Sequence, residues 1–235
     1  GDSPYFPIAR TDEASMSLAI FDLDHTLLNG DSDHAWGEFL VQQQIVEPAF
    51  YQRQNDYFYE QYKQGTLDIH EYLNFALEPL TRFTTQELDL LHRQFMREFI
   101  TPMRQTKAEA LLQQHRERGD FLLIITATNR FITAPIARAM GVDDLLATDP
   151  EIAGGRYTGK VKGTPCYREG KVTRLHQWME DTDHTLEDSY FYTDSINDLP
   201  LLEEVSHPCV VDADERLQDE ARKRNWPQIS LRSNR

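Results

Sequence analysis

The 235-residue chain has little cysteine and no long apolar run, and each absence narrows its class. Its cysteines, Cys166 and Cys209, stand far apart, unlike the close pairs that bind zinc or the many cysteines of a disulfide scaffold. No stretch approaches the length of a membrane span, and the N-terminal region shows no apolar core of a secretory signal. The sequence therefore predicts a cytoplasmic protein that does not enter a membrane. Nothing next to Cys166 in the sequence would lower its pKa, so we do not expect a cysteine nucleophile.

Basic residues are also scarce. Lysine and arginine number 24 against 39 aspartates and glutamates, which gives a formal net charge of −15. Nonspecific binding to nucleic acid or to an anionic membrane depends on positive charge, so we expect neither as a partner. A strongly negative charge is typical of a soluble chain, and it does not indicate an oligomeric state.

Strand-like and helix-like segments alternate along most of the chain. Apolar runs typical of buried strands occur at 18–21, 121–125, 145–148, 190–193 and 209–211, with a last short strand around 229. Helical periodicity separates them at 106–118, 129–140, 171–180 and 197–203, and a glycine-rich hairpin or flap is expected at 150–164. Strands that alternate with helices form a parallel sheet with right-handed crossovers, so the sequence predicts an α/β fold.

Residues 32–101 interrupt this alternation. They show helical periodicity at 35–44, 48–64, 68–77 and 85–99, and no strand pattern. A block of this length is too long for a loop, so we predict an all-helical cap subdomain inserted into a core. The predicted division is a polar flexible tail at 1–15, a catalytic core at 16–31 and 102–235, and the cap at 32–101.

Two carboxylates end the first predicted strand. Asp22, Asp24 and Thr26 directly follow the apolar residues 18–21. The carboxyl ends of parallel strands meet at the edge of the sheet where α/β proteins bind ligands. Two acids at that edge suit a magnesium ion, a nucleophile paired with a general acid/base, or both. Taken alone, the same three residues could simply cap a helix.

Three further polar groups occupy comparable places. Thr126 ends a strand, where its hydroxyl could donate to a phosphoryl oxygen or cap the next helix. Lys171 opens a helix, where a cation is unfavourable unless an anion lies nearby. Asp194 ends a strand, and Asp198 follows it by about one helical turn. Together with the first two acids, these groups supply what phosphoryl transfer requires: a nucleophile, an acid/base, a magnesium site and positive donors.

With these residues in this order, the chain resembles the haloacid dehalogenase-like phosphatases. The four motifs of that family are DxDx[TV], a strand-end serine or threonine, a lysine and an acidic pair. They match, in turn, Asp22/Asp24/Thr26, Thr126, Lys171 and Asp194/Asp198. The resemblance covers about residues 18–215 and implies a Rossmann-like parallel-sheet core with a helical cap.

The resemblance also implies a role for each matching residue. Asp22 would be the nucleophile that becomes an aspartyl-phosphate, and Asp24 would protonate the leaving alcohol and then activate water. Thr126 and Lys171 would complete the catalytic set by holding the phosphate. The implied Mg²⁺ ligands are Asp22, Asp24 through its carbonyl, Asp194 and, in support, Asp198. The implied substrate contacts are Asp31, Thr126, Ala127, Lys171 and Asn197.

The phosphoserine phosphatase branch is the most similar, because it shares the DLDHTLL opening, the cap position and the DSxND segment. Two positions depart from it. Asp31 stands where that branch has a glutamate that holds the substrate amine, and Ala76 stands where it has an arginine that grips the substrate carboxylate. Arg53 or Arg82 could replace that arginine, although the spacing places neither. A carboxylate site without its guanidinium is a poor one, so phosphoserine is disfavoured.

An amine-binding acid beside a cap rich in aromatic residues suits an amino-alcohol phosphate that carries a ring. We expect most cap aromatics to form the core of the cap and one or two to line a pocket. The predicted function is a Mg²⁺-dependent phosphomonoesterase for a small alcohol phosphate, with histidinol phosphate as the first candidate. The alternatives are a phosphoserine phosphatase, a phosphotransferase or mutase, a lipid-phosphate or protein phosphatase, and a non-catalytic regulatory phosphate-binding module. The intact acids at 22 and 24 disfavour the last of these, and the large cap favours a small substrate.

Overall fold

The computed structural model describes residues 6, 8 and 16–233. The predicted flexible tail, residues 1–15, therefore lies mostly outside the described residues. Its two described members, Phe6 and Ile8, pack against the core, and the Phe6 amide donates to Gln114 Oε1 at 2.9 Å. Within the described part, no helix combines the length and the apolar character needed to cross a membrane.

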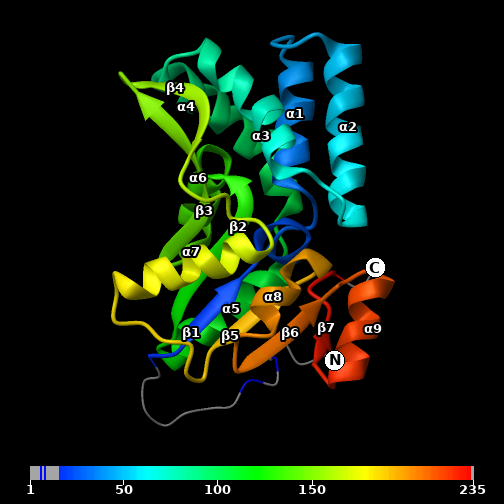
Figure 1. Ribbon diagram of the computed structural model, residues 1–235, viewed down its shortest axis with the longest axis vertical. Coiled ribbons are helices and arrows are strands. Elements are labelled where there is room, and N and C mark those ends of the chain that lie inside the picture. The colour runs from blue at the N-terminus through cyan, green and yellow to red at the C-terminus, as the bar shows by residue number, and fades with distance from the viewer. Residues whose placement is uncertain (1–5, 7, 9–15, 234–235) are drawn as a thin grey trace.

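A seven-stranded sheet organises the described chain (Figure 1). Its strand order is β4–β3–β2–β1–β5–β6–β7, and all neighbours are parallel except β3 and β4. The strands are β1 Leu18–Phe21, β2 Phe121–Asn129, β3 Asp144–Ala153, β4 Arg156–Lys162, β5 Tyr190–Thr193, β6 His207–Val211 and β7 Gln228–Ile229. β1 is central, since Phe21 pairs with Ile124 on one side and with Tyr192 on the other. The predicted α/β fold is confirmed.

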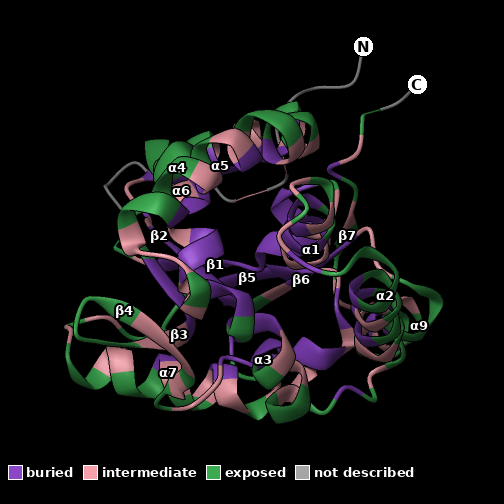
Figure 2. Cartoon of the chain, turned by 90° about the horizontal axis from the view of Figure 1, so that it is seen from above, coloured by how far each residue is buried: buried purple, intermediate pink, exposed green. Residues whose placement is uncertain are grey.

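Successive residues of β1 face opposite sides of the sheet, and both sides are buried. Ala19 and Phe21 belong to the apolar cluster under α5 and α6, whereas Leu18 and Ile20 belong to the one under α7, α8 and α9. The helices are α5 Thr106–Arg118, α6 Arg130–Met140, α7 Glu169–Glu180, α8 Leu199–Leu202 and α9 Glu215–Arg224. Figure 2 shows the buried strands between α5 and α6 on one side and α7 on the other. This three-layer arrangement explains why the strands are continuous apolar runs.

Four helices between β1 and α5 lie over the carboxyl edge of the sheet (Figure 1). They are α1 Ser32–Gln42, α2 Pro48–Gln64, α3 Ile69–Leu77 and α4 Thr85–Phe95. α1 begins three residues before the predicted start at 35, because Asp31 accepts hydrogen bonds from the amides of Asp33 and His34 and caps it. The helix predicted at 85–99 leaves regular α geometry after Phe95, where a wider turn at 96–100 precedes Pro102.

The inserted helices and the core share apolar contacts. Trp36 of α1 meets Phe131 of α6 edge-on, with ring centroids 5.1 Å apart. The hairpin expected at 150–164 is present as β3 and β4, and Tyr157 of β4 lies against Phe131 at 5.8 Å. β3 runs well beyond the predicted 145–148, because the same strand leaves the parallel sheet and enters the hairpin. The hairpin also contacts α3 and the neighbouring residues 78–82 of the inserted segment. The core and the inserted segment are thus in contact, and the domain boundaries at 31/32 and 101/102 remain predictions.

Candidate active site

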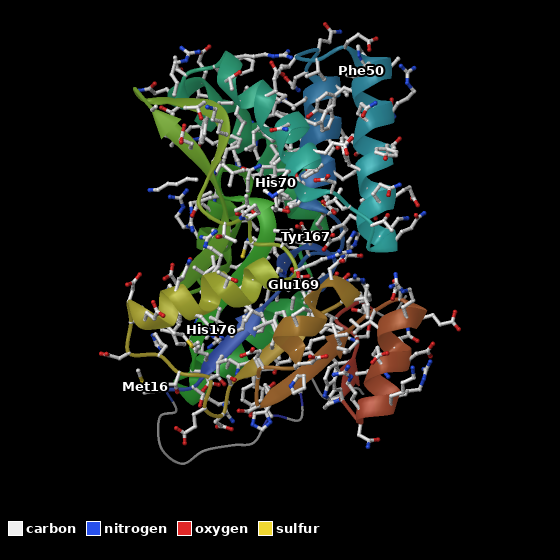
Figure 3. The ribbon with its side chains drawn as sticks, viewed as in Figure 1. Met16, Phe50, His70, Tyr167, Glu169 and His176 are labelled. Atoms are coloured by element: carbon white, nitrogen blue, oxygen red, sulfur yellow. The ribbon has the colours of Figure 1, made fainter. Side chains whose placement is uncertain are left out.

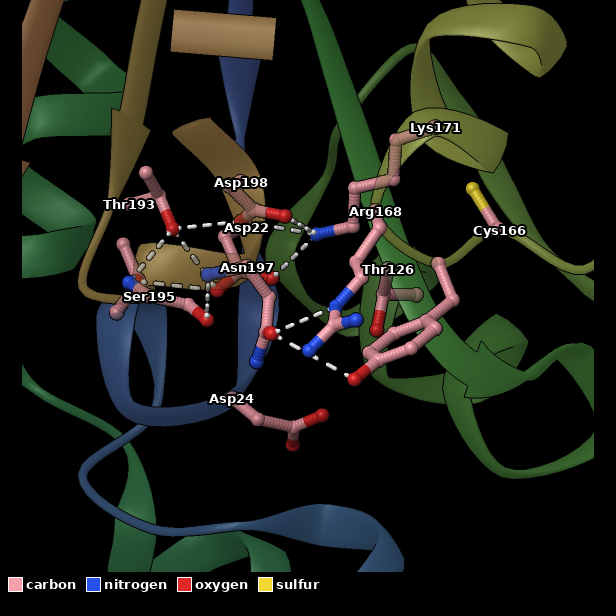
Figure 4. Close-up of polar contacts among 12 residues, drawn as sticks. Asp22, Asp24, Thr126, Cys166, Arg168, Lys171, Thr193, Ser195, Asn197 and Asp198 are labelled. Atoms are coloured by element: carbon pink, nitrogen blue, oxygen red, sulfur yellow. Dashed lines mark hydrogen bonds and ion pairs between the residues drawn. The ribbon is translucent and has the colours of Figure 1, made fainter. Parts of the chain in front are cut away.

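Three motif residues from distant parts of the chain form one buried ion-pair cluster. Asp22 directly follows β1, Asp198 lies one turn beyond β5, and Lys171 extends from the first turn of α7. Lys171 Nζ lies 3.2 Å from Asp22 Oδ1 and 2.9 Å from Asp198 Oδ1 (Figure 4). All three residues are at most 3% exposed. A buried charge is tolerated only with such partners, so the lysine and the two carboxylates depend on one another.

The charges of this cluster are set by their neighbours. Burial by itself would lower the pKa of Lys171, but Asp198 and Asp22 raise it above its ordinary value. Lys171 therefore stays a cation at neutral pH. Burial raises the pKa of Asp198 to about 6, although Lys171 opposes the rise. Thr193 Oγ1 also donates to Asp198 Oδ2 at 2.7 Å.

Asp194 lies beside the same cluster, next to the carboxylate of Asp22. Thr26 Oγ1 donates to Asp194 Oδ1 at 2.9 Å and accepts from the Asp194 amide at 3.0 Å. Burial and then the neighbouring Asp22 raise the pKa of Asp194 well above its ordinary value. A cation bound between these two carboxylates would offset their electrostatic repulsion.

A hard divalent cation suits these oxygen ligands. Within residues 6, 8 and 16–233, no three side chains of histidine, cysteine, aspartate or glutamate are arranged to hold a metal ion. Mg²⁺ usually needs only one or two carboxylates because it keeps several waters. Asp22 and Asp194 would supply such a pair. Lys171 and Thr193 bond to Asp198 as well as to Asp22.

Asp24 is held by both of its carboxylate oxygens. The Ser32 amide donates to Oδ1 at 2.7 Å, and Thr128 Oγ1 donates to Oδ2 at 2.7 Å. Burial and then the charge of Asp31 raise the pKa of Asp24 to about 6. A fixed carboxyl group that titrates near neutral pH suits a general acid/base.

The other predicted substrate residues divide into two groups. Asp31, Thr126 and Ala127 line one pocket together with Asp22 and Asp24. Asn197 lies outside that lining and joins the core to the inserted helices. Its Oδ1 accepts from Arg168 Nε at 3.1 Å, and its Nδ2 donates to the Tyr62 carbonyl at 3.3 Å.

Aromatic residues of α2 and α3 form the far wall of this pocket. Four of them line it, more than the one or two expected: Phe58, Tyr59, Tyr62 and Tyr72. Tyr51 and Phe75 instead stack on each other at 4.5 Å, and Tyr57 is half exposed. Phe58 also packs with Tyr167, which lies between α7 and the inserted helices (Figure 3). Aromatic rings of α2 and α3 thus form much of the pocket wall.

The pocket has no lysine or arginine among its described lining residues. Arg82 is occupied elsewhere, since it donates to Glu78 and to the Ile45 carbonyl. Arg53 is exposed on α2 and does not line the pocket. Ala76, at the position of the missing arginine, is buried in the packing of α3. Neither arginine therefore replaces the carboxylate clamp.

The comparisons with known proteins agree with this geometry. A family model for haloacid dehalogenase-like hydrolases matches residues 19–203. The chain belongs to this family. A histidinol-phosphatase from Neisseria meningitidis is 44% identical over 220 residues, which cover 92% of this chain and 99% of that protein. A phosphoserine phosphatase from Mycobacterium tuberculosis is 28% identical, covering 89% of this chain and 69% of that protein.

Solved structures show the same family fold. A protein of unknown function from Bordetella pertussis superposes with a TM-score of 0.87 at 44% identity, covering 93% of this chain and all of that one (100%). A substrate-bound phosphoserine phosphatase superposes with a TM-score of 0.68 at 17% identity, covering 94% of this chain and 95% of that one, which shows a shared fold. The predicted resemblance and fold class are confirmed. The family match and the relatives named as phosphatases also confirm the predicted enzyme class.

Two residues of this hydrolase site were missed by the sequence analysis. Thr128 lies two residues after Thr126 in β2 and lines the same pocket, and this spacing could have revealed it. Asp33 lines the pocket from the first turn of α1, and it escaped notice because the helix was expected to begin later. Cys166, in contrast, behaves as predicted. It is fully buried, and burial raises the pKa of its thiol to about 12, which disfavours a nucleophilic thiolate.

Thr128→Val should lower kcat by about 10-fold and change KM by less than about 3-fold, because it removes one hydrogen bond that orients Asp24. Thr128→Ser keeps the hydroxyl and should retain most of the activity. Steady-state hydrolysis of p-nitrophenyl phosphate by the three proteins measures both constants. Wild-type kcat in Thr128→Val would show that Asp24 does not need this donor.

Proposed function

We propose that the protein is a Mg²⁺-dependent phosphomonoesterase that acts through an aspartyl-phosphate, with histidinol phosphate as its substrate. One observation carries the proposal: Asp22, paired with Lys171, and Asp24, held by Thr128, line one pocket at the carboxyl edge of the sheet. A nucleophile and an acid/base that face one cavity are the minimum for a two-step displacement at phosphorus.

In the first step a carboxylate oxygen of Asp22 attacks phosphorus, and the bond between phosphorus and the ester oxygen breaks. Asp24 gives its proton to the leaving alkoxide, which departs as the alcohol. In the second step Asp24 takes a proton from water as that water attacks the phosphorus of the aspartyl-phosphate. The phosphorus–Asp22 bond breaks and inorganic phosphate is released. The raised pKa of Asp24, about 6, suits both proton transfers near neutral pH.

The surrounding residues hold the phosphoryl group. Lys171, which bonds to Asp22, and the Thr126 hydroxyl, which lines the pocket, would bind its oxygens. Asn197, which donates to the Tyr62 carbonyl of α2, would add a further contact. Asp22, the Asp24 carbonyl and Asp194 would hold Mg²⁺, with Asp198 in support. When bound, the ion supplies positive charge that offsets the repulsion between substrate phosphate and these carboxylates.

The pocket favours an alcohol phosphate with an amine and a ring. Asp31 uses Oδ1 to cap α1, which leaves its other oxygen for a substrate amine. The aromatic wall offers faces for a ring. A substrate carboxylate would face several acids and no lysine or arginine in the described lining, which disfavours phosphoserine. The relative named histidinol-phosphatase supports the same choice. As part of the same proposal, the protein acts in the cytoplasm.

Phosphate release in the presence of Mg²⁺ tests the proposal. The panel is histidinol phosphate, phosphoserine, phosphoethanolamine, glycerol phosphate and p-nitrophenyl phosphate, with EDTA-treated enzyme as the metal control. We expect the highest kcat/KM for histidinol phosphate. A preference for phosphoserine would contradict the substrate assignment, and no release from any compound would contradict the enzymatic proposal itself.

A further inference from the structure

Asp33 is a second acid in the organic part of the pocket, and the family motifs do not include it. It lies in the first turn of α1, is half-buried and lines the pocket with Asp31. Tyr72, from α3, lines the same pocket. Residues of two different helices therefore lie around this carboxyl group.

The groups that face Asp33 are acidic or phenolic. They are Asp24 and Asp31 on the core side of the pocket, Tyr51 on α2 and Tyr72 on α3. His34 also lines the pocket, but its ring is engaged by Asp56 at 2.8 Å. Burial and then the charge of Asp31 raise the pKa of Asp33 to about 8. Ionisation of Asp33 is therefore unfavourable in the pocket without a ligand. A cationic or N–H group on the ligand would stabilise the ionised carboxylate.

The walls next to Asp33 are aromatic. Phe58 and Tyr72 meet edge-on, with ring centroids 5.3 Å apart, and Tyr59 and Tyr62 complete the wall. A flat ring can stack here while a nitrogen at its edge reaches a carboxylate. A ring without such a nitrogen would leave this carboxylate without a partner on the ligand, and an unpaired polar group in a closed site is a strong basis for rejecting a close analogue.

We propose that Asp33, which shares the pocket wall with Tyr72, determines specificity by binding a basic ring nitrogen of the substrate, while Asp31 binds the substrate amine. The inference rests on the proposed function, and it makes the preferred substrate a phosphate ester with two separate basic nitrogens. Either a neutral imidazole N–H or an imidazolium can donate to Asp33. A phenyl ring of the same size cannot.

The test compares histidinol phosphate with 2-amino-3-phenylpropyl phosphate, which keeps the amine and replaces imidazole by phenyl. We expect wild-type kcat/KM to favour the imidazole compound by about 10- to 100-fold. Asp33→Asn keeps a neutral acceptor and should reduce this ratio about 10-fold, and Asp33→Leu should bring it to about one. Asp89→Asn removes an exposed carboxylate of α4 and should keep the wild-type ratio.

The outcomes separate the two proposals. Wild-type turnover of histidinol phosphate with an unchanged ratio in both Asp33 variants would overturn the role of Asp33 and leave the proposed function standing. Absence of turnover by the wild-type enzyme would overturn the proposed function, and the inference with it.

A second measurement does not depend on turnover. An unfolded aspartate ionises near its ordinary pKa, whereas Asp33 in the folded protein keeps its proton up to about pH 8. Wild-type stability relative to Asp33→Asn should therefore fall as pH rises between about 4 and about 8, because the folded carboxyl resists ionisation. The melting temperature of Asp33→Asn should exceed that of wild type by a margin that grows between about pH 5 and about pH 9. A margin that is the same at both pH values would show that the folded protein does not raise the pKa of Asp33, and would overturn the view that its charge lacks a partner in the pocket.

Discussion

Asp22→Asn should lower kcat for every phosphomonoester by about 10⁴-fold or more, because an amide cannot attack phosphorus. The replacement is nearly isosteric, so the buried packing around Asp22 should persist. It also removes the repulsion between Asp22 and Asp194, which offsets the loss of the ion pair with Lys171. The melting temperature should therefore change by only a few degrees.

Phosphate release under single-turnover and steady-state conditions measures this effect, and circular dichroism confirms the fold. Asp89→Asn, on the exposed face of α4, is the matched control and should keep the wild-type rate. Residual activity above about 1% of wild type in Asp22→Asn would contradict the assignment of Asp22 as the nucleophile.

Lys171→Met should destabilise the protein by about 3–5 kcal/mol, because it leaves the carboxylates of Asp22 and Asp198 buried without their cation. It should also reduce kcat by at least about 100-fold, since a positive donor to the transferred phosphoryl group is lost. Mg²⁺ should recover part of the lost stability, because a bound cation neutralises the same carboxylates.

Urea unfolding with and without Mg²⁺ measures the change in stability. Lys63→Met is the matched control, because Lys63 is about half exposed on α2, where it forms a surface ion pair with Glu60 and lies over the Tyr59 ring. Equal free energies of unfolding for the two variants would show that Lys171 is not the counter-charge of the buried acids.

Much of this site could be predicted from the sequence because its chemistry is attached to strand ends. Asp22, Thr126 and Asp194 each follow an apolar run, and parallel strands bring their carboxyl ends to one edge of a sheet. Lys171 at the start of a helix likewise indicated a nearby anion, and the structure pairs it with two. These predictions depend only on local periodicity and on the handedness of crossover connections.

Only the tertiary structure decided what the pocket recognises. The rotation of α1 directs Asp33 into the cavity, and the packing of α3 brings Tyr72 to it from 39 positions further along the chain. Arg82 pairs instead with Glu78, four residues earlier in the chain, and the described pocket lining has no lysine or arginine. Helical periodicity identifies an apolar face, but the angle at which that face meets the core depends on side-chain packing between distant segments. The catalytic residues were therefore determined by the sequence of each strand and turn, whereas substrate selection was determined by how the inserted helices pack over them.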